Sequence, residues 1–240
     1  MSGNGYPVVF LHGFLESMSM WGHLIFFGFK SVSFDLPGHG TSPFSFANHF
    51  SVKEIAVLVK NELQQLGIEN YSIVGHSLGG YIGVELMKMD EKCDKIVFLN
   101  SNFWEDDEQK KIDRQRIAKI VMRNKTSFIY EAIPHLFLNP EKFHDEVVGL
   151  INEAKLIQAK VIAEYSVAMS KRQNNEHFVK ANSNRVCVIQ GVEDVIVPVT
   201  RMDIYSEDMN FSYQKLSPCG HMSHIEQGEK VQKIITDFLK

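Results

Sequence analysis

The most informative segment of the chain reads Ser72-Ile73-Val74-Gly75-His76-Ser77-Leu78-Gly79-Gly80-Tyr81. Its apolar start predicts a strand, residues 78–89 predict a helix, and Gly-x-Ser-x-Gly forms the turn between them. A serine on so sharp a turn is held in a strained backbone conformation, and the flanking glycines leave the room that the turn needs. The turn raises the Ser77 hydroxyl above the sheet and leaves the Leu78 amide free to donate to an oxyanion. The segment therefore predicts a nucleophilic serine.

The same glycines also suit a phosphate-binding loop. Gly75 and Gly80 have the spacing of the P-loop, but Tyr81 stands where that loop requires lysine. No Gly-x-Gly-x-x-Gly follows a predicted strand. We therefore favour the nucleophile over a phosphate site.

Short, nearly continuous apolar runs recur at 8–11, 72–74, 95–99 and 185–189. Such runs are typical of strands buried on both faces, as in a parallel sheet that is covered by helices. Helical patterns lie between them, most clearly over 52–66. The alternation of strands with helices of this length predicts a doubly wound α/β sheet.

The alternation stops between residues 102 and 181, where the sequence has helical patterns alone, and it resumes with the strand at 185–189. We predict a core formed by residues 1–101 and 182–240, with a helical cap or lid insertion over 102–181. Such an insertion over the carboxyl ends of the strands excludes water, shapes the pocket and gates it.

Two helical stretches are expected inside the cap. The acidic residues at 105–108 favour the first turn of a helix that has Lys119 and Arg123 near its end. Two prolines then interrupt the pattern, and a long helical pattern runs from Glu141 to about Ser170.

The composition is that of an ordinary globular protein, with 240 residues, 44% hydrophobic and 22% charged. The net charge of -4 argues against nucleic acid as a partner. Three widely spaced cysteines form neither a disulfide framework nor a metal-binding pair. No lysine or arginine precedes Lys30, and the apolar runs are far shorter than a membrane span. We expect a soluble cytoplasmic protein, monomeric or homodimeric, without membrane attachment.

The general base for Ser77 is expected later in the chain, on a loop that follows a strand. His221 stands after a glycine, just past the predicted last strand at 212–216. The acid that orients it is expected on the preceding strand-end loop, where Asp194 is our candidate and the adjacent Glu193 is the alternative. The resulting order of serine, aspartate and histidine differs from the orders in chymotrypsin and subtilisin.

His224 follows His221 closely and is expected to be structural. With Glu226 these histidines complete no recognised zinc signature, so we expect neither a metal nor an organic cofactor.

A second amide donor for the oxyanion is expected after a neighbouring strand. His12-Gly13-Phe14-Leu15 follows the strand at 8–11, and the Phe14 amide is the natural candidate. Alone, His-Gly also fits a histidine that is hydrogen-bonded in the core. Together with the serine turn it predicts an oxyanion hole made by the Phe14 and Leu78 amides.

Five segments together resemble the α/β-hydrolase superfamily, in its small cap-bearing branch of serine hydrolases and esterases. They are His12-Gly13-Phe14, Asp35-Leu36-Pro37-Gly38-His39-Gly40-Thr41-Ser42, Gly75-His76-Ser77-Leu78-Gly79-Gly80, the Asp194 loop and Gly220-His221. The resemblance spans almost the whole chain outside the expected cap. It implies an α/β-hydrolase fold, a nucleophilic Ser77, an Asp194 and His221 pair that stabilises charge, and the oxyanion hole named above.

In this family the strand before the oxyanion loop is usually the third, whereas here Val8 opens it after seven residues. We therefore expect about six strands, with the first two strands of the family missing and residues 30–35 at a sheet edge. The alternation of polar and apolar residues in Ser31-Val32-Ser33-Phe34 is that of a half-exposed strand.

The predicted reaction is the cleavage of a carboxylic ester, or a related acyl compound, through an acyl-enzyme on Ser77. Haloalkane dehalogenases and epoxide hydrolases carry aspartate at the nucleophile position. This chain has Ser77 there, which argues against both activities. Carbon-carbon bond hydrolases and a menaquinone-pathway lyase, SHCHC synthase, keep the serine and are alternatives. The lyase typically has an arginine after Gly-Gly, where this chain has Tyr81. A ligand-binding receptor that retains the triad is a further alternative.

The candidate substrate contacts are Leu15, Tyr81 and Trp104, with Trp104 at the entry to the cap, where it can close the pocket from above. Three further aromatic residues fall in or near loops that can face the pocket: Trp21, Phe44 and Phe46. We predict a small-molecule substrate with an apolar acyl group of small to medium size.

Overall fold

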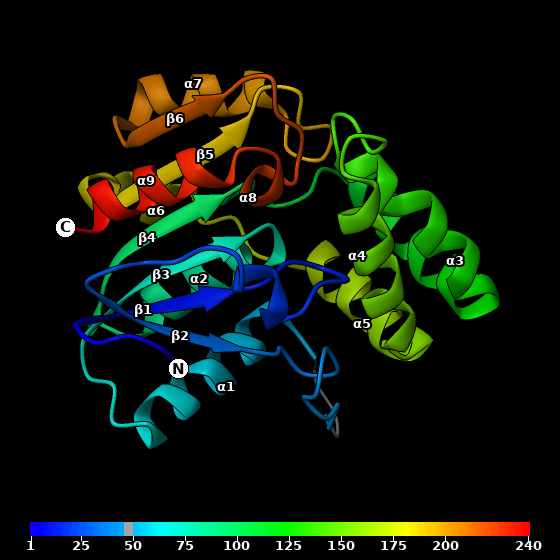
Figure 1. Cartoon of the computed structure of the whole chain (residues 1–240), viewed down its shortest axis with the longest axis horizontal. Helices are drawn as coiled ribbons and strands as arrows, with labels where there is room; N and C mark the ends of the chain where they lie inside the picture. The colour runs from blue at the N-terminus through cyan, green and yellow to red at the C-terminus, as the bar shows by residue number, and fades with distance from the viewer. Residues whose placement is uncertain (46–49) are drawn as a thin grey trace.

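The computed structural model describes residues 1–45 and 50–240, and at its centre is a six-stranded sheet (Figure 1). The strands are β1 (Tyr6–Leu11), β2 (Phe29–Phe34), β3 (Tyr71–His76), β4 (Cys93–Leu99), β5 (Val186–Gly191) and β6 (Ser212–Leu216). They lie in the order β2-β1-β3-β4-β5-β6, and every pair of neighbours is parallel. The predicted parallel α/β sheet is confirmed. Phe46, named above as a pocket candidate, lies outside the described residues.

Helices connect the strands, as parallel pairing requires. The α-helices are α1 (Val52–Gln65), α2 (Leu78–Met89), α3 (Glu108–Ala132), α4 (His144–Leu156), α5 (Ala159–Ser170), α6 (Glu176–Ala181), α7 (Val199–Met209), α8 (Ser223–Glu226) and α9 (Gly228–Leu239). The 3-10 helices are η1 (Met18–Trp21), η2 (Pro134–Leu136) and η3 (Ser183–Arg185). Helix α1 begins after the N-cap residue Ser51, whose Oγ accepts from the Glu54 amide at 3.2 Å and donates to the Glu54 carboxylate at 3.1 Å.

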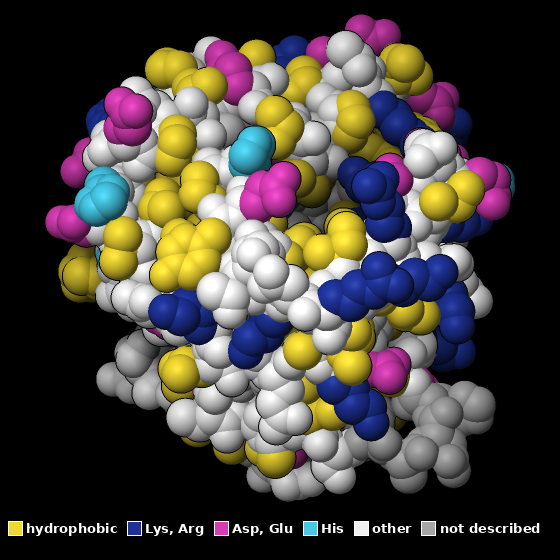
Figure 2. Space-filling view, turned by 90° about the vertical axis from the view of Figure 1, so that its right-hand side faces the viewer, with side chains coloured by type: hydrophobic (Ala, Val, Ile, Leu, Met, Phe, Trp, Pro, Cys, Tyr) yellow, Lys and Arg dark blue, Asp and Glu magenta, His cyan; other side chains and the backbone are white. Residues whose placement is uncertain are grey.

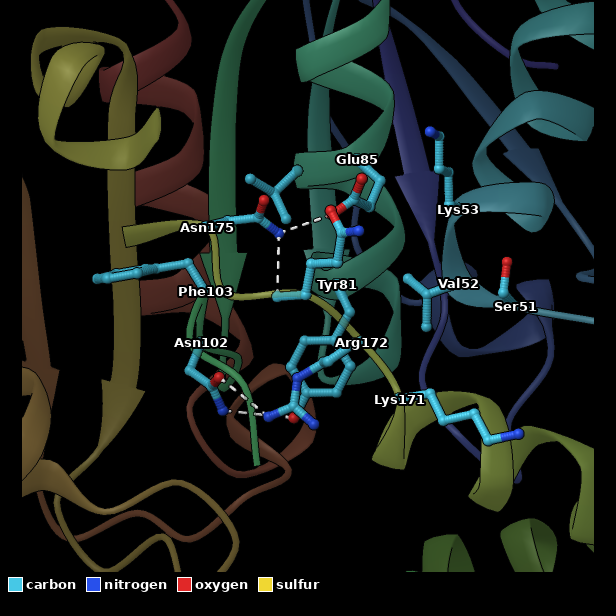
Figure 3. A pocket seen from close by; sticks show the side chains of 12 residues that line it. Ser51, Val52, Lys53, Tyr81, Glu85, Asn102, Phe103, Lys171, Arg172 and Asn175 are labelled. Atoms are coloured by element: carbon cyan, nitrogen blue, oxygen red, sulfur yellow. Dashed lines mark hydrogen bonds between the residues drawn. The ribbon is translucent and has the colours of Figure 1, made fainter. Parts of the chain in front are cut away.

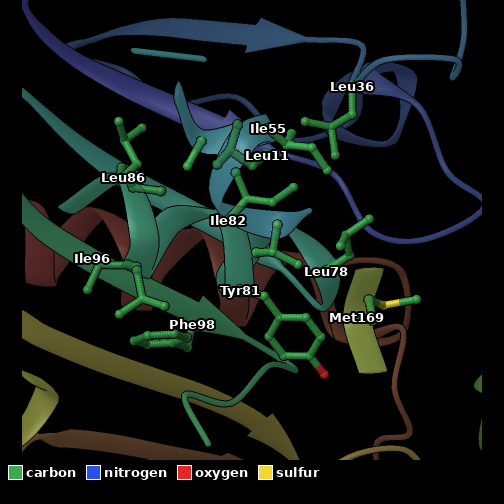
Figure 4. Packing of buried hydrophobic residues seen from close by; sticks show 14 of the residues in the cluster. Leu11, Leu36, Ile55, Leu78, Tyr81, Ile82, Leu86, Ile96, Phe98 and Met169 are labelled. Carbon is green, nitrogen blue, oxygen red and sulfur yellow. The ribbon is translucent and has the colours of Figure 1, made fainter. Parts of the chain in front are cut away.

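The sheet has an apolar layer on each face. In β1, Val9 and Leu11 belong to the layer under α1 and α2, which Figure 4 shows around Ile82. Val8 and Phe10 belong to the opposite layer, which α9 covers. Because both faces are covered, the strands have continuous apolar runs instead of an alternating pattern.

Strand β2 forms one edge of the sheet, where it pairs with β1 alone among the strands of the described chain. On its outer side, Ser31 exchanges two backbone hydrogen bonds with Ser2, at 3.0 and 2.8 Å. Val32 is buried, whereas Ser31 and Ser33 are partly exposed. The predicted edge position of residues 30–35 is confirmed.

Helix α3 begins at the predicted acidic cluster, where the Asp107 carboxylate accepts from the Lys110 amide at 2.8 Å. The predicted end near Arg123 coincides with a kink at Asn124, where φ is -152° and ψ is 77°. The Asn124 side chain accepts from the Ser127 amide at 3.1 Å and so caps the second part of the helix.

The long helical pattern predicted over 141–170 proves to be two helices, α4 and α5. They are separated by Ile157 and Gln158, which have extended backbone. Lys125 Nζ from α3 donates to the Lys155 carbonyl at 2.6 Å and to the Ile157 carbonyl at 2.7 Å. A cation from another helix thus satisfies carbonyls at the end of α4, which makes the break possible.

Helices α3, α4 and α5 lie beyond the carboxyl ends of the strands (Figure 1). Figure 2 shows the outer face of this side of the molecule, where hydrophobic side chains are interspersed with lysine and arginine side chains. Across the described residues, none of the helices combines the length and the apolar character needed to cross a membrane.

The buried face of α1 is tested by two alanine substitutions on that helix. Ile55 is fully buried, so Ile55→Ala is expected to cost about 2–5 kcal/mol of unfolding free energy. For a chain of this size that lowers the Tm by roughly 5–15 °C. Val57 is 40% exposed, and Val57→Ala is expected to change the free energy by about 0.5 kcal/mol or less. Equal losses in thermal unfolding of the two variants would contradict this orientation of α1.

Candidate active site

Ser77 lies where β3 ends and α2 begins. Its φ of 47° and ψ of -112° fall outside the regions that ordinary residues adopt, as predicted for a serine on this turn. The Ser77 amide donates to the Leu99 carbonyl at 3.0 Å, and the Ser77 carbonyl accepts from Ser101 Oγ at 2.6 Å. These two bonds tie the turn to the end of β4 and hold the strained residue in place.

Glycine is required where this turn packs against its neighbours. A Cβ at Gly79 would stand 2.1 Å from the Leu11 carbonyl oxygen, and one at Gly75 would stand 2.4 Å from the Gly79 carbonyl oxygen. Both clashes are with backbone atoms, which cannot move aside as a side chain can. The first turn of α2 therefore approaches β1 as closely as the sequence motif predicts.

His221 and Asp194 come together from the loops after β6 and β5. His221 Nδ1 lies 2.9 Å from Asp194 Oδ2 and 3.0 Å from Oδ1, and both side chains are buried. The alternative acid, Glu193, instead accepts from the Ser217 hydroxyl and the Cys219 amide. A carboxylate on Nδ1 fixes the tautomer in which Nε2 is the basic nitrogen.

Three further donors hold the Asp194 carboxylate. The Ile196 and Val197 amides donate to Oδ1 at 2.8 and 3.1 Å, and Asn100 Nδ2 donates to Oδ2 at 3.0 Å. Burial raises the pKa of Asp194, but the nearby His221 and these hydrogen bonds outweigh burial and hold the pKa below its ordinary value.

Asn100 was not predicted. Its place just after β4, at the same sheet edge as Ser77, is the signal that could have found it.

A cavity of about 570 Å³ joins Ser77 and His221 beneath α3 and α5. Phe14 and Leu15 from the loop after β1 form part of its wall, and Leu15 has a φ of 69°. Most of the remaining apolar wall comes from the helical segment between β4 and β5, namely Ile117, Phe128, Ala132, Leu136 and Met169. That segment therefore lies over Ser77.

The Phe14 and Leu78 amides have no backbone acceptor in the described part of the chain. Leu78 is the first residue of α2, and the first amides of a helix have no acceptor within it.

The His221 ring is hydrogen-bonded to Asp194 and not, among the described residues, to Ser77 Oγ. The hydrogen bond between a nucleophile and its base often tightens only in the complex with substrate.

Two of the three predicted substrate contacts lie elsewhere. Tyr81 is buried beside a separate cavity of about 140 Å³, with the Arg172 guanidinium 4.2 Å from its ring centre (Figure 3). Trp104 is buried in a stack on Tyr205, with 5.2 Å between the ring centres. Neither ring lines the Ser77 cavity, because Tyr81 packs against Arg172 and Trp104 packs against Tyr205, so their contact with substrate stays a prediction. Leu15 does line that cavity.

Two other aromatic candidates, Trp21 and Phe44, also pack with core residues. Trp21 is buried in the layer under α9, with its ring centre 5.2 Å from that of Phe10. Phe44 packs against Phe50, with 5.2 Å between the ring centres. Neither residue lines the Ser77 cavity.

A buried ion pair adjoins Ser77. Glu16 accepts from His76 Nδ1 at 2.8 Å and from the Gly13 amide at 2.5 Å, and His76 Nε2 donates to the His221 carbonyl at 3.1 Å. Burial raises the pKa of Glu16, but the charge of His76 outweighs it and lowers the pKa to about 2. Burial lowers the pKa of His76, and Glu16 more than offsets this, so the pKa is raised. Neither residue was predicted to belong to the site. The signal for Glu16 was its position as a single carboxylate in an apolar loop.

A known family matches nearly the whole chain. The family model described as "alpha/beta hydrolase fold" matches residues 6–227. The chain belongs to this family. A protein of Acinetobacter baylyi named "Putative carbamate hydrolase RutD" is 27% identical to this α/β hydrolase over 224 residues, which cover 88% of this chain and 84% of that protein.

Solved structures share the fold of this α/β hydrolase over almost its full length. An esterase from Thermogutta terrifontis, with malate bound, has a TM-score of 0.87 and 23% identity, covering 99% of this chain and 90% of that chain. The enol-lactonase from Burkholderia xenovorans LB400 has a TM-score of 0.85 and 18% identity, covering 99% of this chain and 92% of that chain. At these identities the likeness shows the fold.

The Glu16 and His76 pair predicts a pH-dependent stability. The pKa of Glu16 is about 2 in the fold against an ordinary 4.5, so its carboxylate stabilises the fold above about pH 4.5. This stabilisation is lost as the pH falls towards 2. Breaking a buried pair costs about 3–5 kcal/mol, so Glu16→Gln is expected to lower the Tm by roughly 6–15 °C at about pH 6 and by much less at about pH 3.

The matched control is Glu153→Gln. Glu153 accepts from the Ser17 and Ser19 hydroxyls on the outer side of the same loop, and its loss is expected to cost less at every pH. Thermal unfolding of both variants across this pH range checks the prediction. A Tm difference for Glu16→Gln that is the same in acid as near neutrality would contradict it.

Proposed function

We propose that this α/β hydrolase cleaves a carboxylic ester, or a related acyl compound, through an acyl-enzyme on Ser77. The observation that carries the proposal is that a strained Ser77 shares one largely apolar cavity with a buried pair of His221 and Asp194. A hydroxyl, an imidazole and a carboxylate in this arrangement are the parts that acyl transfer needs. The relatives named as an esterase and an enol-lactonase point to the same class of bond.

In the first half of the reaction, Ser77 Oγ attacks the carbonyl carbon of the substrate while His221 Nε2 takes the hydroxyl proton. The negative charge that develops on the carbonyl oxygen is stabilised by the Phe14 and Leu78 N–H groups. The carbon-oxygen bond to the leaving group then breaks, and His221 returns the proton to the departing alkoxide. Asp194 keeps the ring oriented and stabilises the imidazolium that forms in between.

The second half repeats these steps with water. His221 takes a proton from a water molecule, the hydroxide attacks the acyl carbon, and the bond to Ser77 Oγ breaks as the proton returns to it. The product acid leaves and the hydroxyl of Ser77 is restored. The chain's own residues supply every proton transfer, and no step needs a metal or an organic cofactor.

We assign residues 1–101 and 182–240 to the core and 102–181 to a cap, because α3 and α5 cover Ser77 and line its cavity. Their apolar side chains suit an apolar acyl group of small to medium size, and the volume of about 570 Å³ is that of a small-molecule site. A cover of this kind limits the entry of water, which strengthens the electrostatic interactions beneath it.

Carbamate cleavage is the second candidate function. It is favoured by the A. baylyi relative, which bears the name of a carbamate hydrolase and matches 88% of this chain. The same three residues would form a carbamoyl-enzyme on Ser77, so the two candidates differ in the substrate and in how fast the intermediate is hydrolysed.

The nucleophile and its partners are tested by substitution. Ser77→Ala is expected to lower kcat for p-nitrophenyl butyrate by at least about 10⁴-fold, because the acyl-enzyme can no longer form. Asp194→Asn is expected to lose about 10⁴-fold, because the ring takes the wrong tautomer. Glu193→Gln is the control and is expected to keep most of its turnover, since Glu193 contacts Ser217 and Cys219 instead. Undiminished turnover in Ser77→Ala would refute the proposed function.

The choice between ester and carbamate is tested by nitrophenol release from p-nitrophenyl butyrate and p-nitrophenyl N-butylcarbamate. For an esterase, the ester gives steady turnover, whereas the carbamate gives a burst of one nitrophenol per Ser77 and then slow release, because the carbamoyl-enzyme is hydrolysed slowly. Steady turnover of the carbamate at the rate of the ester would instead favour the second candidate.

A further inference from the structure

Glu16 and His76 contact the three functional segments of the candidate site. The Gly13 amide, which donates to Glu16, immediately precedes Phe14, and His76 immediately precedes Ser77. The other ring nitrogen of His76 donates to the carbonyl of His221 itself. Phe14, Ser77 and His221 are therefore each in, or next to, a residue that belongs to this pair or is hydrogen-bonded to it.

These hydrogen bonds require His76 to be an imidazolium. One ring nitrogen faces a carboxylate oxygen at 2.8 Å and the other faces a backbone carbonyl oxygen at 3.1 Å. Neither oxygen carries a proton, so both nitrogens must donate, and a neutral imidazole has one N–H. The pair is thus a carboxylate and an imidazolium, 3% and 1% exposed respectively.

The loop after β1 is shaped around this pair. A Cβ at Gly13 would stand 2.2 Å from Glu16 Oε2 and 2.7 Å from His76 Nδ1, so the loop closes on the ion pair only with glycine there. On the far side lies His224, also buried, with its ring centre 4.7 Å from that of His76. Burial and the charge of His76 hold the pKa of His224 well below its ordinary value, so this neighbour stays neutral.

We propose that Glu16 and His76 are positioning residues for acyl transfer, whose ion pair sets the Phe14 amide, Ser77 and His221 relative to one another. The inference rests on the proposed function, because Ser77 and His221 are its reacting groups. Glu16 and His76 border the same cavity, but among the described residues neither is hydrogen-bonded to Ser77 Oγ or to the His221 ring. The ion pair acts by fixing the ends of three loops that lie far apart in the sequence.

The test is a double-mutant cycle of Glu16→Gln, His76→Gln and the double variant, with kcat and KM measured for p-nitrophenyl butyrate below the Tm of each. Each single variant is expected to lower kcat by roughly ten- to a hundredfold with KM within about threefold, because displacement by about 1 Å costs up to about a hundredfold. The double variant is expected to lose less than the product of the two single losses, since both break the same pair.

Glu153→Gln is the matched control, because it removes a carboxylate of α4 that accepts from Ser17 and Ser19 in the same loop, and it is expected to keep kcat and KM. If Glu16→Gln fails to fold, kcat and KM are measured on the double variant, which leaves no unpaired buried charge. A measurement on the unmodified protein needs no variant. Nitrogen NMR of the His76 ring near neutral pH is expected to show both nitrogens protonated.

An unchanged kcat in folded Glu16→Gln would overturn the proposal, and so would a rise in KM alone, which would mean that Glu16 only contacts substrate. A neutral His76 ring in the unmodified protein would also overturn it. If the unmodified protein shows no turnover that depends on Ser77, the proposed function fails, and the NMR signal of the His221 Nδ1 proton then decides the inference. A shift of that signal in Glu16→Gln but not in Glu153→Gln supports positioning, and no shift in either overturns it.

Discussion

The close approach of α2 to the ends of the central strands is the constraint on which the rest of the site depends. There is no room for a Cβ at Gly79 against the Leu11 carbonyl, nor at Gly80, where it would stand 2.2 Å from Ser101 Oγ. Contact with the first turn of α2 therefore fixes the ends of β1, β3 and β4 relative to one another. The loops that carry Phe14, Ser77 and Asn100 all start from these fixed points, which is why a few hydrogen bonds suffice to place them.

The parts of this arrangement that are decided locally could be predicted from the sequence. The strand, the turn and the helix around Ser77 are determined within about ten residues, because a strained serine needs glycine on both sides. Asp194 and His221 are distant in the chain, but each follows a predicted strand, and parallel strands end at the same edge of a sheet. Topology alone therefore brings them near Ser77, but it does not by itself decide between Asp194 and the adjacent Glu193.

Contacts between distant segments could not be predicted. Glu16 and His76 are 60 residues apart, and Asn100 and Asp194 are 94 apart, so nothing local shows which polar groups will share a buried site. The placement of Tyr81 and Trp104 outside the Ser77 cavity has the same origin. Tyr81 stands near the start of α2 and Trp104 at the entry to the cap, but the direction of each ring is decided by packing against Arg172 and Tyr205, which come from other elements.

The break between α4 and α5 is a further case. No glycine or proline marks it in the sequence, and the helical pattern continues through Ile157 and Gln158. The lysine that satisfies the carbonyls at the break, Lys125, belongs to α3 and lies 30 residues before Lys155. A helix can end without a local stop signal when a side chain from elsewhere replaces the missing backbone donors.

Each of the two buried carboxylates of the site is paired with one histidine. Glu16 neutralises His76, the ring that must stay charged, while Asp194 faces His221, the ring whose charge changes in the proposed reaction. The ring centres of these histidines are 5.1 Å apart, so an unpaired charge on His76 would repel the imidazolium that forms at His221 in the proposed reaction. Because Glu16 balances that charge, and because His76 directs its second N–H to the His221 carbonyl instead of its ring, His76 can fix the position of the base without placing an unpaired charge beside it.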